Sequence, residues 1–136
     1  MRKIVLGPGV LVDIDDIFLF NLKDNKIRTV LNTVTFSTNK EAENKFNYLI
    51  NEYMDSLNLI EFAPTTWIAR DKIKGTDIET IEEGCLKITT VYKGIIYFKN
   101  LDCNSWVIKG KTEDEIVQQL DIFNEKIIKS YSLDKK

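Results

Sequence analysis

The sequence contains no histidine, and this absence excludes more functions than any other feature of its composition. Histidine is the side chain that most often acts as a general base near neutral pH and as a ligand to transition metals. Ser-His and Cys-His nucleophile pairs are therefore excluded. Zinc sites that contain histidine are excluded as well, and two cysteines are too few for a site with four cysteine ligands. We predict a protein without a metal site or a cofactor, and only carboxylate, lysine or tyrosine chemistry remains for an enzyme.

Long apolar runs and an excess of basic residues are also missing. No segment approaches the roughly 18 uncharged apolar residues of a membrane span, and the apolar run at residues 4–6 is shorter than the about 7–15 residues of an export signal. The net charge is −2 with both signs interspersed, whereas non-specific nucleic-acid binding needs a basic face. Two cysteines do not make a disulfide framework, which fits a reducing compartment. We predict a cytoplasmic protein that contacts neither a membrane nor nucleic acid directly.

What the sequence does contain is the pattern of two amphipathic helices. Each begins with a capping box, in which a threonine is followed three residues later by a glutamate: Thr38 with Glu41, and Thr112 with Glu115. The apolar residues that follow have the same spacing from each threonine, at +4, +8, +11, +15 and +19. They are Ala42, Phe46, Leu49, Tyr53 and Leu57 in the first segment and Ile116, Leu120, Phe123, Ile127 and Tyr131 in the second. This spacing places each set on one helix face.

Short strand patterns precede both helices. They lie at residues 18–22, 27–32 and 34–36 in the first half and at 86–91, 95–100 and 106–108 in the second, while 13–17 resembles 77–81. Asp24-Asn25 and Lys93-Gly94 are predicted to form the hairpin turns, and Pro8-Gly9 a type II turn between strands at 3–6 and 10–14. Pro64 separates two short strands, at 59–62 and 66–69. The tail at 130–136 is predicted to fray.

These elements predict an α+β fold with an antiparallel sheet, either continuous or in two parts, and two amphipathic helices on one face. We expect one domain over residues 1–136, with a pseudo-repeat of two strand-strand-strand-helix halves at 10–57 and 77–131 joined by 58–76. Chance similarity between two such units is the alternative explanation of the repeat.

Five residues are candidates for a ligand or partner site. Trp67 lies near a proline turn with Arg70 and Lys72 close behind it, and tryptophan and arginine are enriched at interface hot spots. Trp106 precedes the second helix, and Arg28 is predicted to pair with Asn21 across the first hairpin. The alternative readings are tryptophans packed in the core and a solvated strand arginine.

The acidic and cysteine side chains carry weaker predictions. Asp13 and Asp15 are expected on one face of a strand and Asp16 on the other, where a solvated face is the simpler reading than a magnesium or calcium site. If Lys93-Gly94 is a turn, Cys85 and Cys103 point to opposite faces of the hairpin, which disfavours a disulfide.

The strand Asp-Ile-Asp-Asp-Ile at 13–17, the short hairpin and the helix start Phe-Ser-Thr-Asn-Lys-Glu-Ala-Glu-Asn-Lys-Phe at 36–46 resemble a pattern found in small α+β proteins. These are proteins of phages and mobile elements of AT-rich bacteria, and the Ile-, Asn- and Lys-rich composition agrees with the resemblance. The resemblance implies no functional residues. It implies a protein that acts by binding, as an inhibitor or adaptor, including inhibitors of host defence proteins.

We therefore predict a non-enzymatic interaction module that binds a protein and forms a homodimer. One alternative is a nucleotide-binding protein, with Trp67 or Trp106 stacking on a base and Arg28 or Arg70 binding phosphate. The other is a carboxylate-based enzyme whose candidate residues are Asp13, Asp15 and Asp16.

Overall fold

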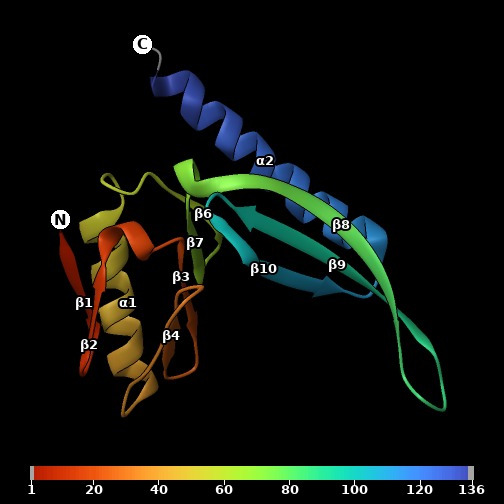
Figure 1. Cartoon of the computed structure of the whole chain (residues 1–136), viewed down its shortest axis with the longest axis horizontal. Coiled ribbons are helices and arrows are strands. Elements are labelled where there is room, and N and C mark those ends of the chain that lie inside the picture. Colours follow the sequence, from red (N-terminus) through yellow and green to blue (C-terminus); the bar gives the residue numbers. More distant parts are fainter. Residues whose placement is uncertain (1, 135–136) are drawn as a thin grey trace. The chain divides into compact units, whose positions relative to one another are not determined.

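The computed structural model of the chain describes residues 2–134, except for the side chains of 102–104 and 134. It confirms an α+β fold with antiparallel sheets and two helices (Figure 1). The chain divides between Lys72 and Ile73 into two compact units, each of which has its own sheet and its own helix. In the described residues, neither helix is both long enough and apolar enough to span a bilayer.

The first unit combines a two-stranded hairpin, a five-stranded sheet and one α-helix. Its elements are β1 (Lys3–Gly7), β2 (Val10–Asp13), the 3₁₀ turn η1 (Ile14–Asp16), β3 (Leu19–Lys23), β4 (Lys26–Arg28), β5 (Thr33–Thr35), α1 (Asn39–Tyr53), β6 (Leu59–Ala63), β7 (Thr66–Ala69) and the 3₁₀ turn η2 (Arg70–Lys72). The large sheet has the order β5-β4-β3-β7-β6, and all of its pairs are antiparallel.

Three predicted turns of the first unit are confirmed. Gly9 has a φ of +76° between β1 and β2, the conformation that a type II turn requires of its third residue. Asp24 has a φ of +56°, and the hairpin closes with Lys23 opposite Lys26. Pro64 lies between β6 and β7, where its missing N–H disrupts no strand pairing.

Helix α1 covers one face of the five-stranded sheet and forms the core of this unit. Its N-cap is Thr38, whose Oγ1 accepts a hydrogen bond from the Glu41 N–H at 3.1 Å. Within the predicted stripe Ala42, Phe46 and Leu49 are buried. The helix ends at Tyr53, earlier than the stripe predicts, yet Leu57 still belongs to the same core. The tertiary core therefore extends past the point where the helical hydrogen bonds stop.

The second unit is a three-stranded meander followed by a long helix. Its elements are β8 (Ile73–Glu83), β9 (Thr89–Phe98), β10 (Leu101–Gly110) and α2 (Glu113–Asp134), and the strand order is β10-β9-β8. Helix α2 contacts all three strands. Its stripe is buried at Ile116, Leu120 and Phe123, whereas Tyr131 is exposed. Helix α2 continues to Asp134, so the segment predicted to fray begins inside this helix.

One predicted turn of the second unit is wrong. Lys93 and Gly94 lie inside β9, where Gly94 pairs with Ile78 on one side and Ile108 on the other. A Cβ at Gly94 would be 2.8 Å from the Ile108 side chain and 3.0 Å from that of Ile116 in α2. The glycine therefore allows the helix to approach the sheet closely instead of forming a turn. The true turns are residues 84–88 and Lys99-Asn100, where Asn100 has a φ of +61°.

This correction changes the prediction for the cysteines. Cys85 is a free, exposed thiol in the β8–β9 turn, so it does not lie in a strand opposite residue 102. The side chain of Cys103 lies outside the described residues. The reasoning that placed the two thiols on opposite faces of one hairpin therefore rested on a wrong register.

The strand-strand-strand-helix pattern is nevertheless present twice. Strands β3, β4 and β5 form an antiparallel meander before α1, and β8, β9 and β10 form one before α2. The two meanders differ in strand length, with three to five residues per strand in the first and ten or eleven in the second. This difference determines which surfaces each unit exposes.

Candidate interaction site

Of the five predicted site residues, Arg70 and Lys72 share the turn η2, whereas Trp67 and Arg28 lie on opposite faces of the five-stranded sheet. Trp67 pairs with Phe20 and therefore lies on the face of the sheet that α1 covers, where it is half-buried against the core. Arg28 pairs with Asn21, one residue further along β3, and lies on the other face. Trp106 is half-buried in the second unit, opposite Ile96 of β9. No pair of a tryptophan and an arginine is thus brought together on one face of the five-stranded sheet.

Arg28 is held by a polar network that joins three strands. Its Nε and Nη2 donate to the Oδ1 of Asn21 at 3.0 and 2.8 Å. The Nδ2 of Asn21 donates in turn to the Oγ1 of Thr66 at 2.8 Å and to the carbonyl of Thr65 at 3.2 Å. Asn21 and Thr66 are buried, where an unpaired polar group is costly. The contacts observed for Arg28 are therefore those of a residue that positions β4 against β3 and β7.

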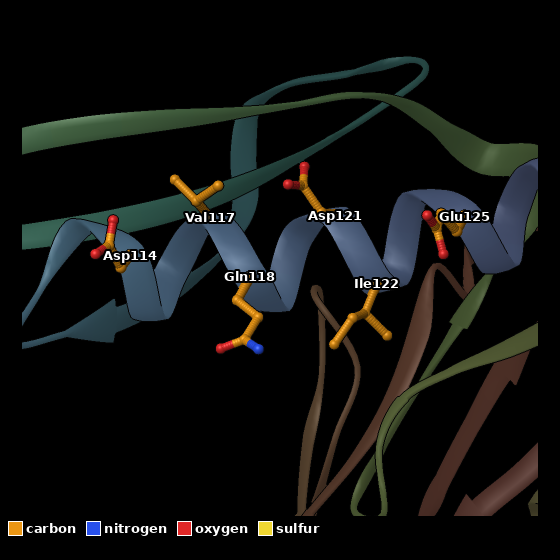
Figure 2. A pocket seen from close by; sticks show the side chains of 6 residues that line it. All are labelled: Asp114, Val117, Gln118, Asp121, Ile122 and Glu125. Atoms are coloured by element: carbon orange, nitrogen blue, oxygen red, sulfur yellow. The ribbon is translucent and has the colours of Figure 1, made fainter.

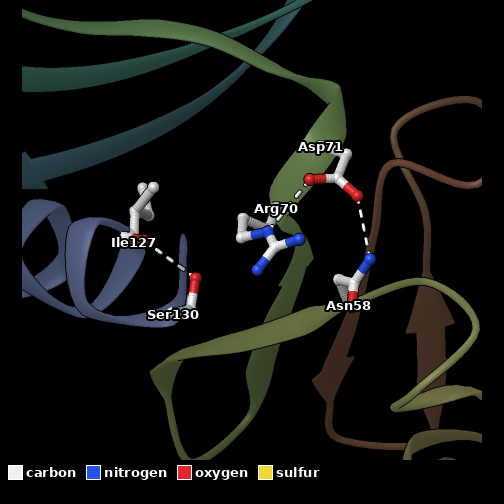
Figure 3. Close-up of polar contacts among 5 residues, drawn as sticks. All are labelled: Asn58, Arg70, Asp71, Ile127 and Ser130. Carbon is white, nitrogen blue, oxygen red and sulfur yellow. Dashed lines mark hydrogen bonds and ion pairs between the residues drawn. The ribbon is translucent and has the colours of Figure 1, made fainter. Parts of the chain in front are cut away.

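Arg70 and Asp71 form a second internal cluster (Figure 3). The buried Arg70 donates from Nε to the Oδ1 of Asp71 at 2.9 Å, and the Nδ2 of Asn58 donates to the Oδ2 of the same carboxylate at 2.8 Å. The Asn58 carbonyl also accepts the Arg70 N–H at 3.1 Å. Asn58 has a φ of +48°, a conformation that asparagine tolerates better than most residues. The cluster fixes the turn after α1 to the end of β7. The separate bond at 2.8 Å in the figure, from the Ser130 hydroxyl to the Ile127 carbonyl, lies within α2.

Lys72 ties the two 3₁₀ turns of the first unit together. Its Nζ donates to the carbonyl of Ile14 at 3.4 Å and to that of Asp15, and it lies 5.0 Å from the centre of the Phe18 ring. Burial lowers the pKa of Lys72, while the nearby charges of Asp15 and Asp16 act in the opposite direction. The Lys72 ammonium therefore has a structural role, because its two carbonyl acceptors and the aromatic ring all belong to the chain itself.

The same contacts correct the prediction for the acidic run. Asp13 ends β2 and forms an ion pair with Lys3 at 2.8 Å, whereas Asp15 and Asp16 lie in η1. The strand alternation assumed for residues 13–16 therefore stops at Asp13. Within the described part of the chain, no group of three or more acidic, cysteine or histidine side chains is arranged to hold a metal ion.

The feature that sequence reasoning missed is the long hairpin of β8 and β9. The last pair of this hairpin is Glu83 with Thr89, and residues 84–88 form its tip, which extends away from the body of the second unit (Figure 1). At this tip Leu86 has a relative exposure of 104% and Ile88 of 66%. We call β8, β9 and residues 84–88 the arm, and residues 84–88 its tip.

The tip is built on one glycine. Gly84 has a φ of +116°, and a Cβ at this position would be 2.1 Å from the carbonyl oxygen of Lys87. The chain therefore folds back on itself more tightly than a side chain permits. The signal in the sequence is a lone glycine between two alternating segments, and the prediction of a turn at Lys93-Gly94 left it without a role.

Charged residues lie in and next to the tip of the arm. Glu82, Glu83 and Lys87 are exposed, and Glu83 lies 3.6 Å from the Lys109 ammonium of β10. At the edge of the sheet, the Asp77 carboxylate of β8 accepts the N–H of Ile78 at 2.8 Å. Where β9 leaves the tip, a hollow of about 770 Å³ lies between β9, β10 and the start of α2. Its lining residues are Thr89, Thr90, Val91, Lys109, Gly110, Lys111 and Glu115.

The outer face of α2 is the other surface of the second unit with a distinct character (Figure 2). A shallow hollow of about 390 Å³ follows this face and is lined by Asp114, Val117, Gln118, Asp121, Ile122 and Glu125. Ile122 is half exposed, and the carboxylates recur at helical spacing on the side away from the buried stripe. Such a solvated, acidic face is the ordinary outer surface of an amphipathic helix.

Comparison with other proteins adds no further constraint. The chain matches no protein-family model, no curated protein and no solved structure.

Proposed function

We propose that this protein is a non-enzymatic interaction module whose arm binds another protein. The observation that carries the proposal is the tip of the arm, where Leu86 and Ile88 are exposed on a turn that only Gly84 permits. A large aliphatic side chain loses roughly 1.5–3 kcal/mol of favourable transfer free energy when it stays in water. Two of them at the end of an ordered hairpin supply an apolar anchor for a pocket on a partner.

The remaining residues of the predicted site support the same conclusion. Arg28, Arg70 and Lys72 make internal contacts that hold strands and turns together. Asp13, one of the residues on which an acid–base mechanism was to depend, is paired with Lys3. The polar side chains of the first unit thus support a scaffold more than a reaction centre.

The resemblance to phage and mobile-element proteins extends the proposal to the kind of partner. It favours an inhibitor of a host defence protein in the cytoplasm, with the arm tip occupying an apolar pocket. The nucleotide-binding alternative gains no support from the contacts, because Trp67 and Arg28 lie on opposite faces of the sheet.

The test uses the thiol that the tip already carries. With Cys103 replaced by serine, a photoreactive maleimide attached to Cys85 places a cross-linker next to Leu86. We expect illumination in cells that make the protein, or in their extract, to capture one specific protein. The double variant Leu86→Ser, Ile88→Ser should lose this capture, since it removes the apolar anchor and leaves the turn.

The matched control moves the cross-linker to the other unit. Ser37 is exposed just before α1. A cross-linker on Ser37→Cys, in a variant without Cys85 and Cys103, therefore reports which abundant proteins are captured by chance. Capture of the same protein from both positions, or capture that survives the double serine substitution, would contradict the proposal. Light scattering over a range of concentrations separates a second copy of the chain from a different partner, because only self-association raises the mass of the pure protein.

A further inference from the structure

Strand β9 has one margin that its own unit leaves unpaired. On one side β9 pairs with β8 along its whole length, as far as Thr89 opposite Glu83. On the other side its pairing with β10 ends at Tyr92 opposite Gly110. Within the described residues, no strand lies beside 89–91 on that side, and the arm continues past the end of β10 (Figure 1). Residues 89–91 therefore form a free edge of the sheet.

The hollow of about 770 Å³ lies along this free edge. It is lined by Thr89, Thr90 and Val91 of β9, by residues 109–111 at the end of β10, and by Glu115 of α2. Alternate residues of an edge strand direct their N–H and C=O groups out of the sheet. The main chain of another strand satisfies such a row of donors and acceptors. The chemistry of the edge therefore identifies its occupant as an extended segment of polypeptide.

The two edges of the arm differ in charge. The outer strand β8 carries exposed carboxylates at Asp77, Glu79, Glu82 and Glu83, and charged side chains are a common protection of edge strands. Residues 88–91, with the sequence Ile-Thr-Thr-Val, contain no charged residue and no proline. All of them are β-branched, and strands favour such side chains. The fold thus protects one edge of the arm and leaves the other suited to the addition of a strand.

The sequence of the free edge is complementary to itself. If two copies of this segment run antiparallel about a twofold axis, Ile88 lies opposite Val91 and Thr89 lies opposite Thr90. Apolar side chains then face apolar side chains, and the threonine hydroxyls can hydrogen-bond to one another. No charged residue meets a like charge within the paired segment. A second copy of the chain therefore fits this edge without any change in its sequence.

We propose that the arm pairs with the arm of a second copy, by antiparallel addition of residues 88–91 at the free edge of β9. The paired segment stops before Tyr92, because Gly110 of β10 already lies beside that residue. The twofold axis closes the interface, so that the product is a dimer and not a filament. The interface is small, and interfaces below about 1,200 Å² are typical of weak association. The dimer should therefore dissociate on dilution.

This inference goes beyond the proposed function and can fail separately from it. Self-association is measured on the pure protein, whereas the proposed function requires capture of a different protein. Leu86, the most exposed residue of the tip, lies outside the paired segment. Leu86→Ser should therefore leave the dimer unchanged, whereas it would weaken any association of two apolar tips.

Sedimentation equilibrium of the pure protein under reducing conditions measures the dimer. For an interface of this size we expect a Kd of about 10 µM to 1 mM. The double variant Thr89→Lys, Thr90→Lys places like charges opposite each other in both threonine pairs and should raise the Kd by about tenfold or more. Circular dichroism checks that this variant keeps the fold.

The matched control adds the same charge to the other unit. Thr33 and Thr35 are exposed on β5, the edge strand of the five-stranded sheet. Thr33→Lys with Thr35→Lys should leave the Kd of the dimer unchanged.

Disulfide trapping tests the register independently of charge. In a chain with Cys85→Ser and Cys103→Ser, one sample carries Thr89→Cys and a second carries Thr90→Cys. Residues opposite each other in an antiparallel pair have Cα atoms about 4.5–5.5 Å apart, which a disulfide can span. We expect oxidation of an equal mixture to give covalent dimers of one variant with the other, and much less dimer from either variant alone.

Several results would overturn the inference. A single monomer mass at all concentrations would show that the edge does not pair. Equal increases of Kd in the two lysine variants would assign the effect to overall charge. Loss of the dimer in Leu86→Ser would replace edge pairing by association of the tips. Equal yields of covalent dimer from the mixture and from each variant alone would exclude the proposed register.

Discussion

The two units use the same order of elements to build surfaces of opposite kinds. In the first unit the strands are short, and the helix, the five-stranded sheet and the β1–β2 hairpin enclose a common core. In the second unit three long strands carry one helix, and the β8–β9 hairpin continues past it into solvent (Figure 1). Strand length decides the difference, because residues beyond the end of the covering helix have nothing in their own unit to bury them.

This comparison teaches where function is to be sought. The polar residues of the first unit that looked functional in the sequence form networks within the unit, as the contacts of Arg28 and Lys72 show. Leu86 and Ile88, two of the exposed apolar residues of the second unit, have no such structural explanation. An exposed apolar group that the fold does not require is a better indicator of binding than a charged group that the fold uses.

The comparison is tested most strongly by one substitution in each unit. Phe46→Ala removes a buried ring from the core of the first unit and should lower the free energy of unfolding by about 3–5 kcal/mol. Leu86→Ala at the arm tip should change it by less than about 0.5 kcal/mol, since the side chain is already in water. Chemical denaturation followed by Trp67 fluorescence in a Trp106→Phe background measures the first, and circular dichroism measures the second. A large loss of stability in Leu86→Ala would show that the tip is packed and not free.

The geometry of the tip gives the next largest effect. Gly84→Ala forces a Cβ against the Lys87 carbonyl at a φ of +116° and should cost about 1–3 kcal/mol in backbone strain or rearrange the turn. Gly75→Ala in β8 is the control, because a Cβ there meets no atom within 4 Å. Two-dimensional NMR of the backbone amides should show changes in Gly84→Ala confined to the end of the hairpin. Equal spectra for the two variants would mean that the tip is not built as described.

The helix caps test whether the two capping threonines contribute equally. Thr38 and Thr112 accept hydrogen bonds from the glutamate N–H three residues later, at 3.1 and 3.3 Å. Alanine at either position should lower the free energy of unfolding by about 1 kcal/mol. Serine at the same positions keeps the hydroxyl and should restore most of the loss. Similar losses for serine and alanine would assign the effect to the threonine methyl group.

The smallest effect concerns pH. Burial lowers the pKa of Lys72 in the folded protein from its ordinary 10.5. Between the lowered pKa of the folded state and the ordinary pKa of the unfolded chain, the unfolded chain binds more protons than the folded one. The free energy of unfolding attributable to Lys72 should therefore rise as pH increases through that window, and the burial cost should persist at lower pH. Denaturation midpoints across the alkaline range, compared between the wild type and Lys72→Met, isolate this contribution. A fall in stability, or the same slope in both proteins, would show that the ammonium is not desolvated.

Much of the fold was predictable from local chemistry. The capped helices, the turns at Gly9 and Asp24 and the pairing of Arg28 with Asn21 follow from residues close in sequence. The prediction of a turn at Lys93-Gly94 was wrong because glycine favours turns and also allows close packing. Only the position of Ile116 in α2 shows that Gly94 has the packing role. Nothing local reveals contacts between distant residues.

The candidate site was less predictable for the same reason. The exposure of Leu86 follows from the length of β8 and β9 relative to α2. A turn predicted at Lys93-Gly94 makes both strands too short, so this exposure could not be predicted. Glu61 and Trp67 stand on either side of Pro64 in the sequence, but their common face depends on the register between β6 and β7, which shifts at an irregularity between Glu61 and Ala63. Burial of Arg70 likewise depends on Asp71 and Asn58, which meet only in three dimensions.

The bond between the Asp77 carboxylate and the Ile78 amide has a consequence for solubility. Strand β8 lies at the edge of its sheet, and an edge strand of eleven residues offers a template for the addition of further chains. With that amide already occupied and carboxylates repeated along the strand, a copy of β8 approaching in antiparallel orientation meets like charge. The carboxylates along this edge therefore oppose the addition of a second copy of β8, and so they oppose the growth of fibres from this strand.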